Sequence, residues 1–82
     1  MSLKTLDARG LRCPMPIVRA KQALDKMVPG ERLEVTATDP GSMADFQGWV
    51  KINSRALLVA QRQETDEAGR TLYIHLIERT DG

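Results

Sequence analysis

The alternation of apolar and polar residues along this chain predicts four short strands. Residues 3–8 form the first, and the turn-forming pair Arg9-Gly10 follows it. Residues 33–38 alternate strictly and are rich in β-branched side chains, which is typical of a half-buried strand. The last two predicted strands lie at residues 56–63 and, after a polar turn at 65–69, at the alternating positions Leu72, Ile74 and Leu76.

Two segments between these strands carry apolar residues at helical spacing. In residues 14–28 the apolar positions recur every three to four residues among charged side chains, which predicts an amphipathic helix ended by Pro29-Gly30. Residues 43–52 predict a second helix, entered through a turn at 39–42 that can supply capping side chains. Its apolar stripe is expected to be core and consists of Met43, Phe46 and Val50, with Trp49 at the edge.

The element order β-α-β-α-β-β predicts one α/β domain of the α+β type over residues 1–82. The first β-α-β unit should contain a parallel strand pair, and the last two strands should form an antiparallel hairpin. Two helices and four short strands then give a two-layer sandwich with a mixed four-stranded sheet. A chain of 82 residues has room for one such core.

Composition and charge narrow the class of protein. The chain is 41% hydrophobic and 28% charged, which is typical of a folded domain, and it has no apolar run long enough to span a membrane. Residues 1–5 do not begin the apolar core of a signal peptide, so a cytoplasmic location is expected. A net charge of +1, with one Trp, one Tyr and one Phe, argues against direct binding of nucleic acid.

The chain has one cysteine, Cys13, and one histidine, His75. Such a chain can form neither an internal disulfide nor a thiolate–imidazole zinc site, so no metal or cofactor is expected. His75 is interpreted as a solvated residue on the strand face opposite the apolar stripe, with a thiol-hydrolase partnership with Cys13 as the alternative. Asp39 could assist at Cys13, but a role in the turn and in capping the next helix explains it more simply.

The segment from Gly10 to Ile17 carries the candidate chemistry. If Cys13 is the N-cap, Pro14 takes the first helical position and Pro16 also lies in the first turn, where a missing N–H costs nothing. The positive end of the helix dipole should then lower the pKa of Cys13 and favour the thiolate, the form that attacks sulfur. Cys13 is therefore the candidate catalytic residue, although packing in a core is the commoner role of a free cysteine.

The neighbours of Cys13 are expected to support the sulfur site or to dock a partner. Arg12 adds positive charge, the two prolines fix the backbone, and the next two free amides should point toward the sulfur. The expected supporting residues are Arg12, Pro14, Met15, Pro16 and Ile17, and the possible docking residues are Arg9, Arg19 and Lys21.

The segment from Leu6 to Pro16, which contains Cys13-Pro14-Met15-Pro16, resembles the signature of the TusA family, also called SirA-like or YedF-like. The likeness continues at Pro29-Gly30-Glu31 and at Thr38-Asp39-Pro40, and it covers essentially the whole chain. It implies the same β-α-β-α-β-β sandwich. It also implies a sulfur carrier whose Cys13 holds sulfur as a persulfide.

The resemblance further implies the partners of such a carrier. The donor would be a cysteine desulfurase or a rhodanese, and the acceptor a DsrE-type protein such as the TusBCD complex, in tRNA thiolation, molybdenum-cofactor supply or sulfur oxidation. The chain would then be a sulfurtransferase-type carrier, expected to be a monomer that acts in a protein relay. Two positions depart from the family: Val50 stands where many relatives have a second cysteine, and residues 53–55 read Asn-Ser-Arg where relatives often have Thr-Gly-His.

Two other classes of function stay open at this point. One is a regulatory or RNA- or protein-binding module without sulfur chemistry, because the fold resembles an RNA-binding domain of translation factors. The other is a self-contained thiol enzyme, for which so small a chain offers little room for a substrate pocket. Replacing Cys13 by serine separates these classes, since a sulfur relay needs the thiol and a binding module does not.

Overall fold

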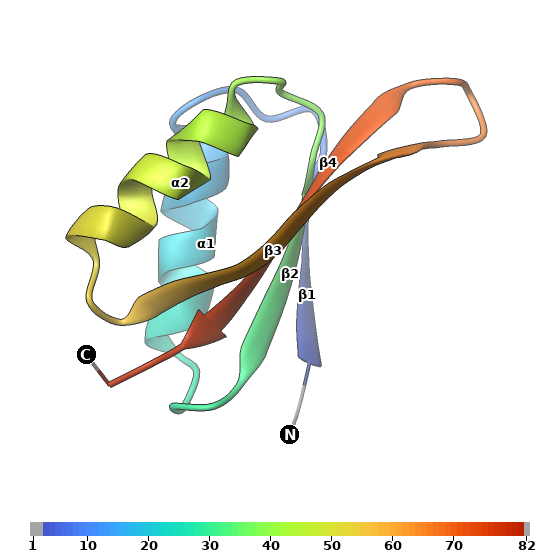
Figure 1. The fold of residues 1–82 in the computed structure, drawn as a ribbon. Coiled ribbons are helices and arrows are strands. Elements are labelled where there is room, and N and C mark those ends of the chain that lie inside the picture. The colour runs from blue at the N-terminus through green and yellow to red at the C-terminus, as the bar shows by residue number, and fades with distance from the viewer. Residues whose placement is uncertain (1–2, 82) are drawn as a thin grey trace.

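The computed structural model describes residues 3–81 and contains the predicted elements in the predicted order (Figure 1). Residues 1, 2 and 82 of the predicted domain lie outside the described residues. The strands differ from their predicted ranges only at their ends. The elements are β1 (Leu3–Ala8), α1 (Met15–Asp25), β2 (Arg32–Ala37), α2 (Ser42–Ile52), β3 (Ala56–Thr65) and β4 (Thr71–Arg79).

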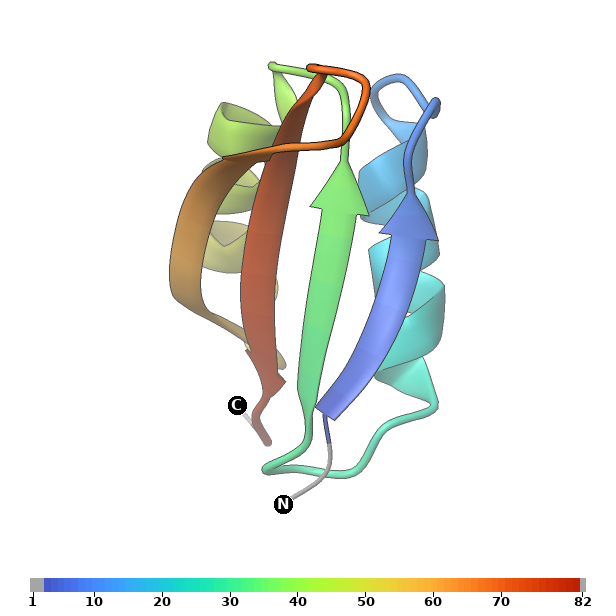
Figure 2. The same cartoon turned by 90° about the vertical axis from the view of Figure 1, so that its right-hand side faces the viewer.

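The strands form a mixed sheet in the order β1-β2-β4-β3. β1 pairs in parallel with β2, and β4 runs antiparallel to both β2 and β3, so the predicted parallel pair and hairpin are confirmed. Both helices cover the same face of the sheet (Figures 1 and 2), which gives the predicted two-layer sandwich. The register of β3 shifts between Leu58 and Ala60, so Val59 forms a β-bulge in this edge strand.

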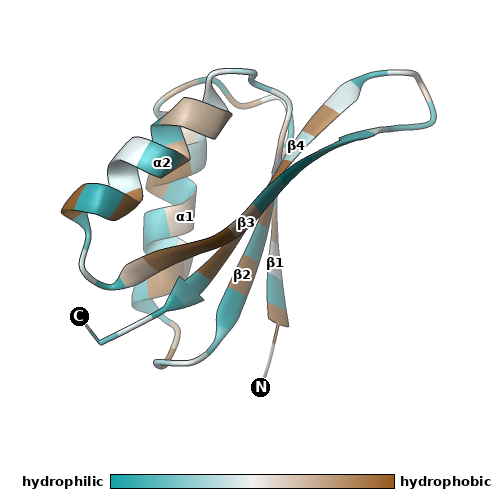
Figure 3. Cartoon of the chain, in the orientation of Figure 1, coloured by the Kyte–Doolittle hydropathy of each residue, from teal (hydrophilic) through white to brown (hydrophobic). Residues whose placement is uncertain are grey.

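The core lies between the helices and the sheet. Leu33, Val35 and Ala37 alternate along β2 and are all buried, as the strict alternation predicts. Phe46 of α2 is completely buried and meets Trp49 edge to face, with 5.9 Å between ring centroids. Burial of such a ring stabilises the fold by about 1.5–3 kcal/mol. Figure 3 shows that β3 is apolar in its first half and hydrophilic in its second half, which runs into the hairpin beyond the helices.

The face of β4 that points to the core carries His75 and not the predicted apolar stripe. His75 and Ile77 are completely buried, and they pair with Val35 and Leu33 of β2. Ile74 is buried on the other face of the sheet, among polar and charged side chains. The prediction of a solvated His75 is therefore wrong. β4 is a central strand with apolar residues on both faces, so alternation alone does not identify its inner face.

His75 is held in the core by hydrogen bonds at both ring nitrogens. Gln61 Nε2 donates to the Met43 carbonyl (2.9 Å) and to His75 Nδ1 (3.0 Å). Because Nδ1 accepts, the ring proton lies on Nε2, which donates to Ser42 Oγ (2.9 Å). The ring also stacks on Phe46 with 4.3 Å between centroids. Burial lowers the pKa of His75 to about 4, so the ring is neutral at pH 7.

The contact with His75 also changes the role expected of the turn before α2. The N-cap of α2 is Gly41, and no side chain caps this helix end by a hydrogen bond. Ser42 turns inward and is buried against His75 instead. The prediction that this turn supplies capping side chains is therefore wrong, and Ser42 fastens the start of α2 to the sheet.

α1 ends earlier than predicted, at Asp25 instead of residue 28. The N–H groups of Lys26 and Met27 bond to carbonyls only three residues back, which tightens the last turn. Arg79, at the end of β4, is buried and donates to the carbonyl oxygens of Leu24 (2.8 Å) and Met27 (3.2 Å). A cation at this position satisfies the last carbonyls and complements the helix dipole.

We expect acid to destabilise the fold through His75 before most carboxylates titrate. The folded protein favours the neutral ring of His75. The stability that this preference contributes is therefore fully present above pH 6.5 and is lost as the pH falls toward about 4. Between pH 7 and pH 5 the free energy of unfolding should fall by about 2 kcal/mol, as measured by urea denaturation. In His75→Gln, whose side chain cannot ionise, the free energy of unfolding should change much less between pH 7 and pH 5. An unchanged decline in that variant would contradict the assignment.

Candidate functional site around Cys13

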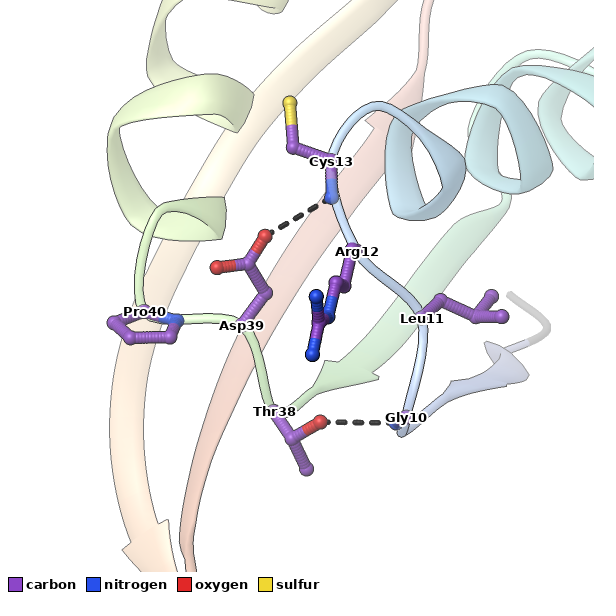
Figure 4. Close-up of a pocket in the computed structure, with 7 residues that line it drawn as sticks. All are labelled: Gly10, Leu11, Arg12, Cys13, Thr38, Asp39 and Pro40. Carbon is purple, nitrogen blue, oxygen red and sulfur yellow. Dashed lines mark hydrogen bonds between the residues drawn. The ribbon is translucent and has the colours of Figure 1, made fainter.

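Two loops meet at the edge of the sheet where β1 and β2 end. Parallel strands end at the same edge, and the last residues of these two strands pair with each other. Two hydrogen bonds join the loops (Figure 4): Gly10 N–H donates to Thr38 Oγ1 (2.9 Å), and Cys13 N–H donates to Asp39 Oδ2 (3.0 Å). Gly10 has a φ of 80°, a left-handed conformation that favours glycine. The main chain before the thiol is therefore fixed by the loop that follows β2.

Asp39 connects the cysteine loop to α2. One carboxylate oxygen accepts the N–H of Cys13, and the other accepts the N–H of Gly41, the N-cap of α2 (3.0 Å). The predicted turn role of Asp39 is thus confirmed, whereas its predicted capping role is not, because no side chain caps α2 by a hydrogen bond. The same carboxylate also fixes the main chain of Cys13, so it determines where the loop lies relative to α2.

Cys13 is exposed at a cavity of about 480 Å³. Packing in the core is therefore not its role. A cleft of this size can receive a small ligand or a segment of a partner protein. The cavity is lined by Gly10, Leu11, Arg12, Cys13, Thr38, Asp39 and Pro40 (Figure 4).

The start of α1 differs from the prediction. Pro14, not Cys13, is the N-cap, and Pro16 occupies the second helical position. Met15 N–H donates to the Arg12 carbonyl (2.8 Å) in a turn before the helix, so this amide is not free to face the sulfur. The Cys13–Pro14 peptide bond is cis. Because the N-cap is Pro14, the thiol lies one residue farther from the helix end than predicted.

Carboxylates, not cations, dominate the surroundings of the Cys13 sulfur. A hydrogen bond to the Asp45 side chain, together with desolvation and the charges of Asp45 and Asp39, raises the pKa of the Cys13 thiol above its ordinary value. In Figure 4 the Arg12 side chain extends from the loop in the opposite direction to the sulfur. The prediction of a lowered pKa is therefore wrong, and the thiol is protonated at neutral pH.

Of the other residues predicted to support the sulfur site, some lie on the surface near the loop and some lie in the core. Pro16 is buried and Ile17 packs against the core, so both support the fold beneath the site. Met15 is exposed at the start of α1, and Arg12 lines the cavity with Cys13. The structure therefore places Arg12 beside Cys13 but turns Pro16 and Ile17 inward.

The three possible docking residues do not line the Cys13 cavity. Arg9 is ion-paired with Asp7 (2.9 Å), and Lys21 is ion-paired with Asp25 one helical turn later (3.0 Å). Arg19 is exposed on α1. His75 bonds to Ser42 and Gln61 in the core. The structure therefore does not support the thiol-hydrolase partnership of His75 with Cys13.

Sequence reasoning did not assign Thr38 and Pro40, which line the cavity, or Asp45, which raises the pKa of the Cys13 thiol, to the site. Thr38 follows directly after a strand parallel to the first, so the rule that parallel strands end at one edge could have placed it beside Gly10. Asp45 had no comparable signal. Its position at the sulfur depends on how the first turn of α2 lies over the loop.

The described part of the chain contains neither a group of side chains that could hold a metal ion nor a helix that could span a membrane. Among residues 3–81, no group of three or more His, Cys, Asp or Glu side chains is arranged to hold a metal ion. Neither α1 nor α2 has the length and hydrophobicity that a membrane-spanning helix requires.

The fold and the site define a small two-layer α/β domain that exposes one thiol just before its first helix. The family model of sulfurtransferase TusA matches residues 4–75. The chain therefore belongs to the TusA family, as its sequence signature predicts.

Individual relatives agree with this assignment. The chain is 44% identical over 77 residues to a candidate sulfur carrier protein of Halobacterium salinarum, covering 94% of this chain and 89% of the relative. It is 47% identical over 58 residues to the sulfur carrier protein TusA of Allochromatium vinosum, covering 71% and 76%. The crystal structure of a SirA-like protein from Desulfitobacterium hafniense has the same fold, with a TM-score of 0.62, 23% identity, and coverage of 94% of this chain and 96% of that one.

We expect removal of the Asp39 carboxylate to loosen the cysteine loop. Asp39→Ala deletes the acceptor of two main-chain N–H groups, each bond being worth about 1 kcal/mol. Amide hydrogen exchange at Cys13 and Gly41 should then accelerate roughly fivefold. Asp39→Asn keeps one oxygen and should retain part of the protection. Asp25→Ala, which removes an exposed carboxylate at the far end of α1, is the matched control. Unchanged exchange at both amides would refute the bridging role.

Proposed function

We propose that this chain carries sulfane sulfur as a persulfide on Cys13, receiving it from one protein and passing it to another. One observation carries the proposal: the only cysteine of the chain is exposed at a cavity that two hydrogen-bonded loops form. Relatives that cover most of this chain are named as sulfur carriers, which supports the same role.

The transfer is a thiol–persulfide exchange without net oxidation. The Cys13 sulfur attacks the outer sulfur of the donor's persulfide; the new Cys13 S–S bond forms as the donor's S–S bond breaks. The Cys13 proton ends on the donor's released thiol. In the second step an acceptor thiolate attacks the outer sulfur on Cys13, and Cys13 leaves as the thiolate and regains a proton. A second cysteine in the chain is not required.

The residues around Cys13 suit a site that a partner must reach. Pro14 and Pro16 have no N–H and restrict the backbone on the helix side, and the bond from Cys13 to Asp39 fixes it on the other side. In the proposal, Arg12 and Met15 contact the partner next to the sulfur. Arg19 makes a further contact along α1. Arg9, in the loop before α1, and Lys21, on α1, would have to exchange their intramolecular ion pairs for contacts with the partner.

The proposed donor is a cysteine desulfurase or a rhodanese, and the proposed acceptor is a DsrE-type protein such as TusBCD. Membership of the TusA family supports partners in a sulfur relay of this kind. The pathway served would be tRNA thiolation, sulfur oxidation or supply of the molybdenum cofactor.

Loading of Cys13 tests the proposal directly. After incubation with a desulfurase plus cysteine, or with a rhodanese plus thiosulfate, the protein should gain the mass of one sulfur atom. The added sulfur should map to the peptide that contains Cys13 and be removed by dithiothreitol. Cys13→Ser is the control and should gain nothing. A wild-type chain that loads with neither donor, or a Cys13→Ser chain that loads equally well, would refute sulfur carriage.

A further inference from the structure

The Cys13 cavity lies next to a second cavity, and two residues line both of them. The second cavity has a volume of about 430 Å³ and is lined by Asp7, Arg9, Gly10, Thr38 and Arg70. Gly10 and Thr38, which are joined by a hydrogen bond of 2.9 Å, also line the Cys13 cavity. Figure 4 shows the Cys13 sulfur and this hydrogen bond at opposite ends of the first cavity. The two cavities together therefore form one groove that runs from Cys13 past Gly10 to Arg70.

The hairpin that joins β3 to β4 supplies the far wall of this groove. Figures 1 and 2 show that the hairpin extends beyond the helices, at the same end of the molecule as the loop that follows β1. The N–H of Asp66 donates to the Arg70 carbonyl (2.9 Å) and closes the turn. The Asp66 side chain also accepts the N–H groups of Ala68 (2.9 Å) and Arg70 (2.8 Å). Arg70 thus belongs to a turn that several hydrogen bonds hold together.

The two carboxylates that line the groove already have hydrogen-bond donors. The oxygens of Asp39 accept the N–H groups of Cys13 and Gly41 (3.0 Å each). The oxygens of Asp7 accept the Nε and Nη2 groups of the Arg9 guanidinium (2.9 Å each). The negative charge in the groove is therefore bound within the protein.

Two guanidinium groups of the groove, in contrast, keep N–H groups for a ligand. Arg70 donates to Asp66 through Nε alone (2.9 Å), and its two terminal nitrogens make no hydrogen bond within residues 3–81. Arg12 forms no ion pair with any of the described residues. A carboxylate is the acceptor that a guanidinium group binds most strongly, because both partners are charged and their geometries match. The groove therefore favours a ligand that carries carboxylates.

We propose that the groove binds an extended, acidic segment of the donor protein, with the donor's persulfide cysteine at the Cys13 end and carboxylates toward the Arg70 end. The inference rests on the proposed function, because this segment is the one from which Cys13 would receive sulfur. It adds the shape and the charge that the donor must present.

The length of the groove sets the spacing within the segment. Gly10 precedes Cys13 by three residues, so the main chain between them spans at most about 10 Å, and the groove continues past Gly10 to Arg70. An extended segment advances about 3.3 Å per residue. A carboxylate three to five residues from the donor cysteine can therefore reach the guanidinium groups. A small-molecule persulfide would occupy the Cys13 cavity alone and would leave Arg70 without a role.

Disulfide exchange between Cys13 and synthetic peptides tests the groove without sulfur transfer. Each peptide carries one cysteine as a mixed disulfide with thionitrobenzoate. The Cys13 sulfur attacks the peptide's cysteine sulfur, the new S–S bond forms as thionitrobenzoate leaves, and the Cys13 proton passes to the buffer. The absorbance of released thionitrobenzoate gives the rate. Two acidic peptides carry Glu residues three to five positions before or after the cysteine, and their matched peptides carry Gln or Lys there.

At low ionic strength, at least one acidic peptide should react about threefold to tenfold faster than its Gln counterpart, and its Lys counterpart should react more slowly. The difference should shrink at high salt, because salt screens exposed charges. Arg70→Gln should reduce the preference for the acidic peptide by about threefold, and Arg70→Glu should reduce it further. Arg55→Gln removes an exposed cation at the opposite end of β3 from the hairpin and is the matched control, which should keep the preference.

The variants at Arg70 should fold, because the main-chain hydrogen bonds of the turn do not involve the Arg70 side chain. Thermal unfolding checks each variant before the rates are compared. Equal rates for the acidic and Gln peptides in the wild type, or an unchanged preference in folded Arg70→Glu, would overturn the inference and leave sulfur carriage untouched. A wild type that prefers the acidic peptide but gains no sulfur from either protein donor would instead overturn the proposed function.

Discussion

The parallel pairing of β1 with β2 is the contact on which the rest of the site depends. It brings the ends of two strands to one edge of the sheet, so that loops separated in sequence by a whole helix and strand become neighbours. Only then can Thr38 and Asp39 accept the N–H groups of Gly10 and Cys13. The thiol is positioned by this pairing as much as by the helix that follows it. A change that weakened the pairing would disturb the sulfur without touching it.

The buried histidine gives α2 a comparable anchor. The side chains of Ser42, His75 and Gln61, a hydroxyl, an imidazole and an amide, hydrogen-bond to one another beneath α2. Such a network costs little only when every member has its partner, and it tolerates few alternative arrangements of the elements that contribute. Here those elements are the first turn of α2, β3 and β4. The end of α2 nearest the cysteine is thus held to the sheet by this network.

Much of the fold was predictable from the sequence because its periodicities are local. The alternation in β2 and the apolar spacing in both helices depend on neighbours a few residues away, and the position of Cys13 before a Pro-X-Pro helix start indicated an accessible thiol. Features that depend on distant residues were not predictable. The inner face of β4 depends on which side the helices cover, and the capping of α1 depends on Arg79, more than fifty residues away in the chain.

In the sulfur site, too, features set by neighbouring residues were easier to predict than features set by distant ones. The N-cap was misplaced by one residue because two prolines so close together allow more than one helix start. The sign of the pKa shift was wrong for a different reason: the helix dipole and Arg12 are visible next to Cys13 in the sequence, whereas Asp45 reaches the sulfur only through the fold. Local reasoning about a thiol is therefore incomplete until the second loop and α2 are in place.

The protonated state of Cys13 also affects how the chain withstands oxidation. Peroxides attack thiolates, and a sulfenic acid formed on Cys13 would have no second cysteine in the chain with which to form a reversible disulfide. It could be rescued only by a thiol from another molecule, or it would oxidise further to an irreversible product. By raising the pKa of the thiol, Asp45 and Asp39 slow the first of these reactions at neutral pH. An exposed thiol that stays protonated is therefore oxidised more slowly by peroxides than a thiolate at the same position would be.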